Sequence, residues 1–225
     1  MASDTCEYSL YTYFRSSCSG RIRIALNLKK IPYKPVYVNL LKGDQSSADY
    51  EKINPSRAVP TLQVTKSGKD TFISQSVAIL EYLEEKFPGQ NPLLPPITDP
   101  EARASVRALV NIIAADTQPV TNLRILQRVD RLGASKEDWS RELQEQGLAA
   151  YERVITATAG KYSVGDSITL ADVCLVPAVW GAVRWGVDMT AFPTIQRIYE
   201  EMDKEPAVQE AHWAKQADTP EGLRQ

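Results

Sequence analysis

The chain has 225 residues, of which 43% are hydrophobic and 24% are charged, so it is long enough for two globular domains with cores that need no disulfide or structural metal. Its net charge of −2 argues against nucleic acid as a partner, because phosphate contacts need a basic excess. The single histidine, His212, leaves almost no material for Ser-His or Cys-His catalysis or for a metal site. We therefore expect no metal, and the reactivity must have another source.

Cysteine usage points to a reduced compartment. Cys6, Cys18 and Cys174 are an odd number, lie far apart and form no CxxC pair. The first residues have neither the basic nor the apolar region of a secretory signal, and the longest apolar run, residues 173–183, is too short to cross a membrane. We expect a soluble, cytoplasmic protein that has no membrane partner.

A proline-rich segment divides the chain. Residues 88–100 hold five prolines and a glycine, a composition that neither a helix nor a central strand tolerates. We therefore expect a linker at 88–100 between an N-terminal domain of residues 1–87 and a C-terminal domain of residues 101–225.

The residues before this linker alternate between strand and helix patterns. In chain order we expect a strand over 8–13, a helix over 17–30, a strand over 36–40, a hairpin of strands around 62–64 and 72–73, and a helix over 76–87. The order is β-α-β-β-β-α, or β-α-β-α-β-β-α if a short helix follows Leu40. Either order suits a small α/β sandwich.

The residues after the linker have helical periodicity throughout. We expect a helix from Glu101 to about Arg131 with a kink at Pro119, and further helices that begin at capping-box patterns headed by Ser135 and Thr169. In this pattern Asp172 is a capping residue. The second domain is therefore predicted to be an all-α bundle.

The segment Ser16-Ser17-Cys18-Ser19 lies between the first strand and the first helix. A helix N-terminus offers unpaired N–H groups and a partial positive charge, so hydroxyls or a thiol placed there can stabilise an anion, including a thiolate. The same pattern also fits serines that merely cap the helix and a cysteine that packs.

Two further short segments have the chemistry of a binding site. Val59-Pro60 precedes a strand, where a cis proline would expose the Val59 backbone to a peptide-like ligand, although a trans proline that starts an edge strand is the commoner case. Gln75-Ser76 places an amide and a hydroxyl at a helix start, which suits either a carboxylate ligand or a routine cap.

The helical half supplies three more candidates. Gln118 and Asn122 are four residues apart and are predicted to share a helix face, turned either to a cleft or to solvent. Arg184 interrupts an apolar, tryptophan-bearing stretch. It suits a carboxylate clamp, and it also suits a helix-end residue whose stem packs on Trp185.

Taken together, these segments resemble the glutathione transferase family and, within it, the zeta class. The resemblance rests on Ser16-Ser17-Cys18-Ser19-Gly20-Arg21-Ile22-Arg23, Asn54-Pro55-x-x-x-Val59-Pro60-Thr61-Leu62, Gln75-Ser76-x-Ala78-Ile79-x-Glu81-Tyr82-Leu83-Glu84, Gln118-Pro119-x-x-Asn122-Leu123, Thr169-x-Ala171-Asp172 and Asp218-Thr219-Pro220. The Val-Pro and Gln-Ser pieces are shared across the family, whereas Ser-Ser-Cys and Gln-Pro-x-x-Asn-Leu are specific to the zeta class.

This resemblance implies a thioredoxin-like N-terminal domain that binds glutathione and an all-α C-terminal bundle. It implies that Ser16 hydrogen-bonds the glutathione sulfur with Ser17 and Cys18 beside it, and that Arg184 holds a substrate carboxylate. The remaining glutathione-binding residues that it implies are Ser19, Gly20, Arg21, Gln45, Val59, Pro60 (in a cis bond), Gln75, Ser76, Gln118 and Asn122.

The activity that the resemblance implies is maleylacetoacetate isomerisation in tyrosine and phenylalanine catabolism, by a homodimer. Glutathione would then supply the missing nucleophile. Two alternatives remain open at this point: a general glutathione transferase that conjugates or dehalogenates small electrophiles such as α-halo acids, and a non-catalytic module of the same fold.

Overall fold

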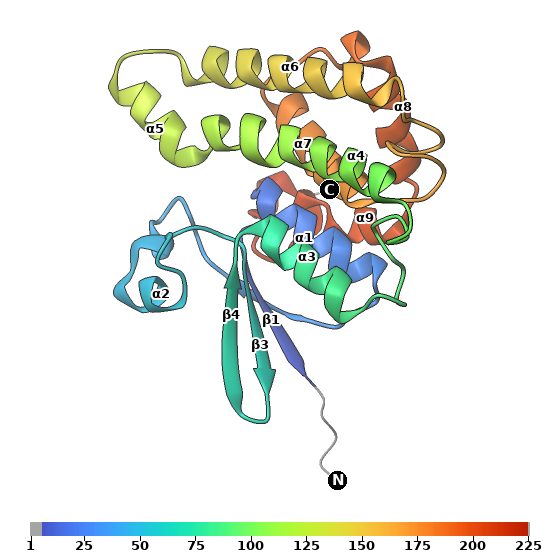
Figure 1. Ribbon diagram of the computed structural model, residues 1–225. Coiled ribbons are helices and arrows are strands. Elements are labelled where there is room, and N and C mark those ends of the chain that lie inside the picture. The colour runs from blue at the N-terminus through green and yellow to red at the C-terminus, as the bar shows by residue number, and fades with distance from the viewer. Residues whose placement is uncertain (1–5, 225) are drawn as a thin grey trace. The chain divides into compact units, whose positions relative to one another are not determined.

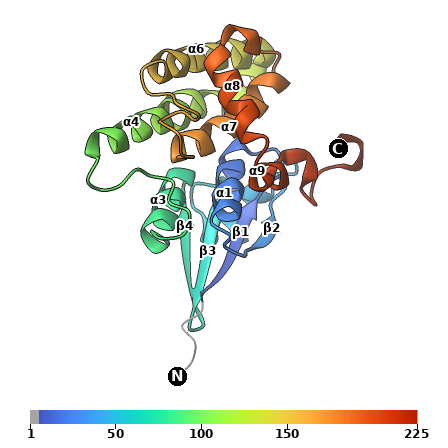
Figure 2. The same ribbon diagram turned by 90° about the vertical axis from the view of Figure 1, so that its right-hand side faces the viewer.

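The computed structural model describes residues 6–224, which fall into two compact units. One unit comprises residues 6–91 and 206–224, and the other comprises Pro92–Glu205. The sequence pattern placed all of 101–225 in one helical domain, so residues 206–224 differ from that expectation. They group with the first unit because helix α9 (Pro206–Ala211) packs on helix α1 (Ser17–Leu28), where Nδ2 of Asn27 donates to the Ala207 carbonyl at 3.0 Å (Figure 2).

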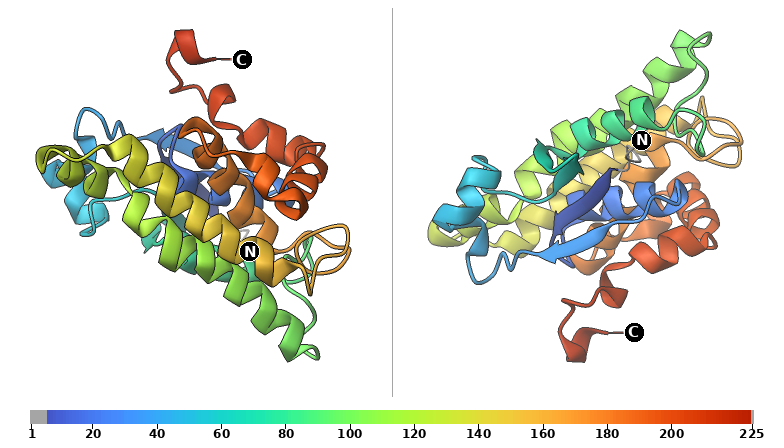
Figure 3. Two further views of the ribbon diagram at one scale, coloured as in Figure 1. Left: turned by 90° about the horizontal axis from the view of Figure 1, so that it is seen from above. Right: turned by 90° about the horizontal axis from the view of Figure 1, so that it is seen from below.

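The first unit is built on a mixed four-stranded sheet in the order β2-β1-β3-β4. Its strands are β1 (Glu7–Thr12), β2 (Lys34–Tyr37), β3 (Thr61–Lys66) and β4 (Lys69–Ser74), and its other helices are α2 (Ala48–Ile53) and α3 (Ser76–Lys86). Strands β1 and β2 are parallel and lie side by side (Figure 3), whereas β3 runs antiparallel to both β1 and β4. Because α2 follows Leu40, the longer of the two predicted orders, β-α-β-α-β-β-α, is confirmed.

Helices α1 and α3 lie side by side against the sheet, and α2 lies away from both (Figure 1). The apolar positions of α1 and α3 recur at helical spacing and are fully buried, as are the inward positions of β1 and β3. The core residues that define this layer are Leu10, Ile22, Leu26, Leu62, Ile79, Leu80 and Leu83. The hairpin between β3 and β4 turns at Ser67 and Gly68, both of which have positive φ.

The second unit is entirely helical. It contains α4 (Pro100–Asn111), α5 (Leu123–Arg131), α6 (Lys136–Ile155), α7 (Leu170–Arg184) and α8 (Pro193–Met202), with α6 alongside α4 (Figure 3, left). The predicted caps are confirmed: Ser135 accepts the Asp138 N–H at 3.0 Å, and Thr169 and Asp172 form a capping box. Asp172 is wholly buried and accepts from the N–H groups of Ser163 and Thr169, which identifies it as a structural residue.

The predicted kinked helix over 101–131 is wrong in detail. Helix α4 ends at Asn111 and is followed by a π-helix (Ile112–Thr117), a 3₁₀ turn (Pro119–Thr121) and the separate helix α5. Pro119 has no N–H to continue the helical ladder, and Asn122 is extended and caps α5 by accepting the Arg124 N–H at 3.1 Å. Gln118 and Asn122 therefore do not share a helix face.

Candidate active site

The start of α1 is capped by a serine, as one of the two sequence alternatives proposed. Ser16 is the N-cap: its Oγ accepts the Ser19 N–H at 3.1 Å, and its own N–H donates to the Tyr13 carbonyl at 3.0 Å. Since Oγ acts only as an acceptor in this bond, the hydroxyl hydrogen stays available for another partner. No acidic residue occupies the first turn of α1, so nothing there opposes the partial positive charge of the helix end.

The next residues continue this turn. Ser17 and Cys18 are half-buried, whereas Ser19 and Gly20 are buried. The Gly20 N–H closes the first helical bond with the Ser16 carbonyl at 2.8 Å. The hydroxyl of Ser19 has no hydrogen-bond partner within residues 6–224, and a buried polar atom of this kind costs free energy unless something satisfies it.

Arg21 links the two predicted helix starts. Its side chain is buried, and its Nη1 donates to the Ser76 hydroxyl at 3.0 Å. Its Nε has no partner among the described residues. Arg21 therefore holds the first residue of α3 and retains one buried donor that these contacts do not satisfy.

Gln75 precedes Ser76 in an unusual backbone conformation, with φ 72° and ψ 120°. A non-glycine residue with positive φ is uncommon and costs free energy, and such residues concentrate at functional sites. The Gln75 side chain is exposed and makes no capping hydrogen bond to α3. The exposed Gln75 side chain thus differs from the Ser76 hydroxyl, which is bonded to Arg21.

The Val59–Pro60 bond is cis, which settles the alternative that the sequence left open. A buried network holds the preceding segment: the Tyr50 hydroxyl donates to the Ala58 carbonyl at 2.7 Å, and Nδ2 of Asn54 donates to the same carbonyl at 2.7 Å. Sequence reasoning missed Tyr50. The signal for it was a lone aromatic residue in an otherwise polar stretch before the Val-Pro pair.

Gln45 lies in a short 3₁₀ turn after β2 and is half-buried. Its Nε2 donates to the Leu40 carbonyl at 3.4 Å, and its Oε1 is buried without a partner among the described residues. The side chain is thereby anchored at one end and has an unused acceptor at the other.

Three of the predicted site residues, Gln118, Asn122 and Arg184, belong to the second unit. Gln118 follows the π-helix and is half-buried, and Asn122 uses its Oδ1 as the cap of α5, which leaves its Nδ2 as a donor. Arg184 is exposed in the last turn of α7, and its guanidinium carbon lies 4.8 Å from the centre of the Trp185 ring. This is the packing on Trp185 that the sequence offered as the alternative to a carboxylate clamp. This stacking orients the guanidinium.

Within residues 6–224 no three His, Cys, Asp or Glu side chains gather into a potential metal site. None of the helices described has the length and apolarity needed to span a membrane.

Two family models match this chain. "Glutathione S-transferase, N-terminal domain" matches residues 15–86, and "Glutathione S-transferase, C-terminal domain" matches residues 128–214. Among curated proteins, the maleylacetoacetate isomerase of Aspergillus fumigatus is 57% identical over 99% of this chain and 97% of its own length.

Solved structures agree with this match. The maleylacetoacetate isomerase of Anaeromyxobacter dehalogenans, solved with GSH bound in its active site, has a TM-score of 0.88 at 38% identity and covers 96% of this chain and 100% of its own. A zeta-class maleyl pyruvate isomerase has a TM-score of 0.88 at 37% identity, over 94% of this chain and 100% of its own.

Proposed function

The chain belongs to the glutathione S-transferase family, and on that premise we propose that it catalyses the glutathione-dependent cis–trans isomerisation of 4-maleylacetoacetate to 4-fumarylacetoacetate. This reaction is a step in tyrosine and phenylalanine breakdown. The observation that carries the proposal is the start of α1, where Ser16 is fixed by its capping bond, keeps its hydroxyl hydrogen available and lies in a first turn without acidic residues. The choice of maleylacetoacetate as the substrate rests on the 57% identity with a maleylacetoacetate isomerase.

Three orphaned polar atoms in the first unit fit glutathione. Ser19 Oγ, Arg21 Nε and Gln45 Oε1 are all buried and unpartnered within the described residues. Glutathione is a tripeptide with two carboxylates, amide groups and a thiol, and it can therefore accept from the arginine and the hydroxyl and donate to the glutamine oxygen. The residues present suit the cofactor that the family uses.

The proposed roles follow from these positions. Ser16 donates to the glutathione sulfur, and the N–H groups of Ser17 and Cys18 add the field of the helix end. Gln45 and the Val59 main chain bind the peptide part. The γ-glutamyl end is bound by Gln75 and Ser76, with Ser19, Gly20, Arg21, Pro60, Gln118 and Asn122 completing the glutathione-binding set.

Bound glutathione supplies a thiolate that can add to the conjugated double bond and turn it into a single bond about which the substrate can rotate. Elimination of the thiolate then restores the double bond in the trans form. The protein's contribution is to favour the thiolate and to orient the diacid. Ser16 and the first-turn N–H groups lower the pKa of the thiol by stabilising negative charge. Arg184, whose guanidinium carbon lies 4.8 Å from the centre of the Trp185 ring, is proposed to hold a substrate carboxylate.

Replacing Ser16 with alanine tests this role. We expect the turnover of maleylacetoacetate to fall by about a hundredfold or more, as for removal of a donor from a developing anion. The change also removes a helix cap, which costs about 1 kcal/mol of stability. Ser135→Ala is the matched control, because it deletes the equivalent cap of α6 at 3.0 Å and should keep wild-type turnover. Near-normal turnover of the Ser16 variant would refute the assignment.

Substrate comparison separates the alternatives. A general conjugating or dehalogenating transferase would turn over an aryl halide or an α-halo acid at least as well as maleylacetoacetate. A non-catalytic module would not bind immobilised glutathione. We expect maleylacetoacetate to be the better substrate, and maleylpyruvate is the informative second diacid because a structural relative isomerises it.

The proposal includes a cytoplasmic homodimer. No disulfide joins Cys6, Cys18 and Cys174 in the described residues, which accords with a reduced compartment. Light scattering coupled to size-exclusion chromatography should give twice the chain mass of 25.1 kDa, and a monomeric mass would refute the dimer.

A further inference from the structure

The turn between β1 and α1 is held by a buried guanidinium that comes from α1 itself. Arg23 is 1% exposed, and its Nη1 donates to the Thr12 hydroxyl at 3.0 Å and to the Tyr13 carbonyl at 3.4 Å. Its Nη2 donates to the Phe14 carbonyl at 3.1 Å. Because these three hydrogen bonds come from one planar guanidinium, they hold the backbone two and three residues before Ser16.

The same guanidinium reaches the C-terminal segment. Nε of Arg23 donates to the Ala211 carbonyl at 3.0 Å, at the end of α9. Burial lowers the pKa of Arg23 to about 10, so it stays charged at neutral pH. One buried cation therefore joins the end of β1, the turn and α9, segments that are far apart in sequence.

The C-terminal segment makes a second polar contact with the turn, through Asp218. The carboxylate of Asp218 accepts the Phe14 N–H at 2.9 Å across 204 residues. Phe14 thus has both its N–H and its carbonyl fixed, the first by Asp218 and the second by Arg23. Charge-assisted bonds to backbone groups are stronger than neutral ones, and the two charged groups also attract each other.

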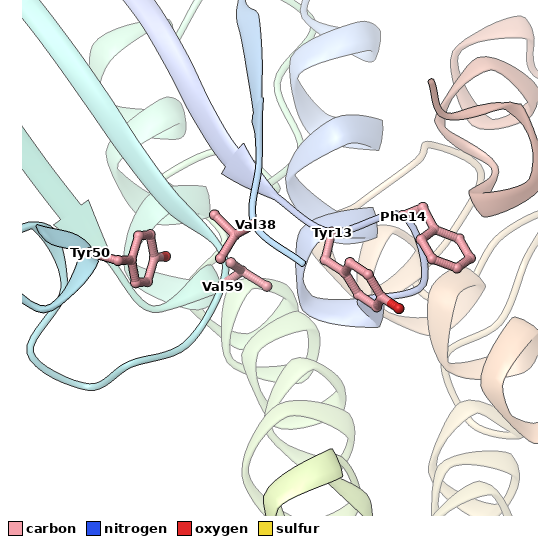
Figure 4. Close-up of a cluster of buried hydrophobic side chains, with 5 residues drawn as sticks. All are labelled: Tyr13, Phe14, Val38, Tyr50 and Val59. Carbon is pink, nitrogen blue, oxygen red and sulfur yellow. The ribbon is translucent and has the colours of Figure 1, made fainter. Parts of the chain in front are cut away.

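A third contact is apolar. Tyr13, Phe14, Val38, Tyr50 and Val59 form one buried cluster (Figure 4), and Trp213 of the C-terminal segment packs against it. The cluster contains residues from the turn before Ser16 and from the cis Val59–Pro60 segment. Residues 206–224 (dark red in Figure 2) therefore pack against the supports of two proposed glutathione contacts.

We propose that Arg23 and Asp218 are positioning residues for the thiol site. They fix the backbone of residues 13–14, and the Tyr13 carbonyl in turn accepts the N–H of Ser16, so the serine hydroxyl is held where it donates to glutathione sulfur. The C-terminal segment is thereby a structural part of the active site. This inference rests on the proposed function, because it assigns the purpose of the turn to glutathione binding.

Two variants and their matched controls test the inference. Asp218→Ala removes the acceptor for the Phe14 N–H, and Asp218→Asn retains an oxygen that can accept it. Arg23→Lys keeps the charge and loses the fork. Asn27→Ala is the control for attachment of the C-terminal segment, because Asn27 lies one turn beyond Arg23 and its side chain donates to α9, at the Ala207 carbonyl, at 3.0 Å.

Two readouts go beyond turnover. The first is amide hydrogen exchange of residues 13–20 in the protein without glutathione, which should quicken about tenfold or more in Asp218→Ala and Arg23→Lys. The second is the pKa of bound glutathione thiol, followed by the ultraviolet absorbance of the thiolate, which should rise by about one unit. Isomerase kcat/KM should fall by between about tenfold and a hundredfold, and Asp218→Asn should recover most of each effect.

Several outcomes would overturn the inference. It fails if folded Asp218→Ala has wild-type exchange and a wild-type thiol pKa, or if Asn27→Ala produces the same changes, since the effect would then be general loosening of α9. If Arg23→Lys does not fold, the Asp218 pair decides alone. A wild-type protein that neither isomerises maleylacetoacetate nor binds glutathione would instead refute the proposed function, which separates the two failures.

Discussion

Replacing Gly147 with alanine probes how closely α6 packs against the π-helix that precedes Gln118. A Cβ at position 147 would lie 2.1 Å from Oγ1, 2.6 Å from Cγ2 and 2.9 Å from Cβ of Thr117. A new rotamer of Thr117 cannot relieve the last contact, so backbone must move. Overpacking of this kind costs about 1–3 kcal/mol, against a gain of at most about 1 kcal/mol from the better helix propensity of alanine. We expect a net loss of about 1–2 kcal/mol in the free energy of unfolding.

Urea unfolding monitored by circular dichroism measures this loss, and a double-mutant cycle assigns it. In a Thr117→Ala background two of the three close atoms are gone, so the penalty of Gly147→Ala should shrink by about 1 kcal/mol or more. Gly89→Ala is the control, because a Cβ there meets nothing within 4 Å, and it should be neutral or slightly stabilising. Additive losses in the cycle, or equal losses at both glycines, would refute the packing argument.

Two ion-pair predictions follow from the structure. Glu201 bridges Lys161 at 2.8 Å and Lys204 at 2.6 Å, and hydrogen bonds from both lysines lower its pKa from the ordinary 4.5 to about 2. The contribution of Glu201 to stability is therefore present above about pH 4.5 and is lost as the pH falls towards 2. In acid titrations of thermal unfolding, the stability difference between wild type and Glu201→Gln should shrink over that pH range. A difference that stays constant with pH would contradict this prediction. Lys29 is fully buried and pairs with Glu84 at 2.7 Å, and its Nζ also donates to the Gln90 carbonyl at 3.0 Å and to the Phe87 and Asn91 carbonyls at 3.3 Å. Lys29→Met should therefore cost about 3–5 kcal/mol in urea unfolding, and the double variant with Glu84→Leu should recover only the part that comes from the unpaired carboxylate, because the carbonyls still lack their donor. Equal losses in the single and the double variant would contradict the pairing.

The sheet and most helices could be predicted because each has a local signal. The start of α1 follows from serines ahead of a helical apolar spacing, and the start of α7 follows from the capping box of Thr169 and Asp172. The break after Asn111 could not be predicted in the same way. Its cause is the Thr117 hydroxyl, which donates to the Ile112 carbonyl at 2.7 Å, together with the loss of an N–H at Pro119, and a periodic pattern carries no sign of a π-helix.

The positions of the candidate residues, as distinct from their roles, were predictable where they lie at element boundaries. Ser16 and Gln75 each directly precede a helix, and Val59 lies two residues before β3, as the sequence patterns predicted. Arg23 and Asp218 were missed as site residues because their role depends on contacts across most of the chain. The sequence does show an arginine between Ile22 and Ile24, which indicates a buried charge that needs hydrogen-bond partners. It does not show which residues those partners are.

The central claim is that glutathione supplies the nucleophile that this histidine-poor chain lacks. The direct test is the rate of maleylacetoacetate isomerisation by the purified protein with glutathione, without it, and with S-methylglutathione, which keeps the tripeptide but blocks the thiol. We expect conversion to fumarylacetoacetate only with glutathione itself, and competitive inhibition by the methylated form. Isomerisation at an undiminished rate without any thiol would contradict the account.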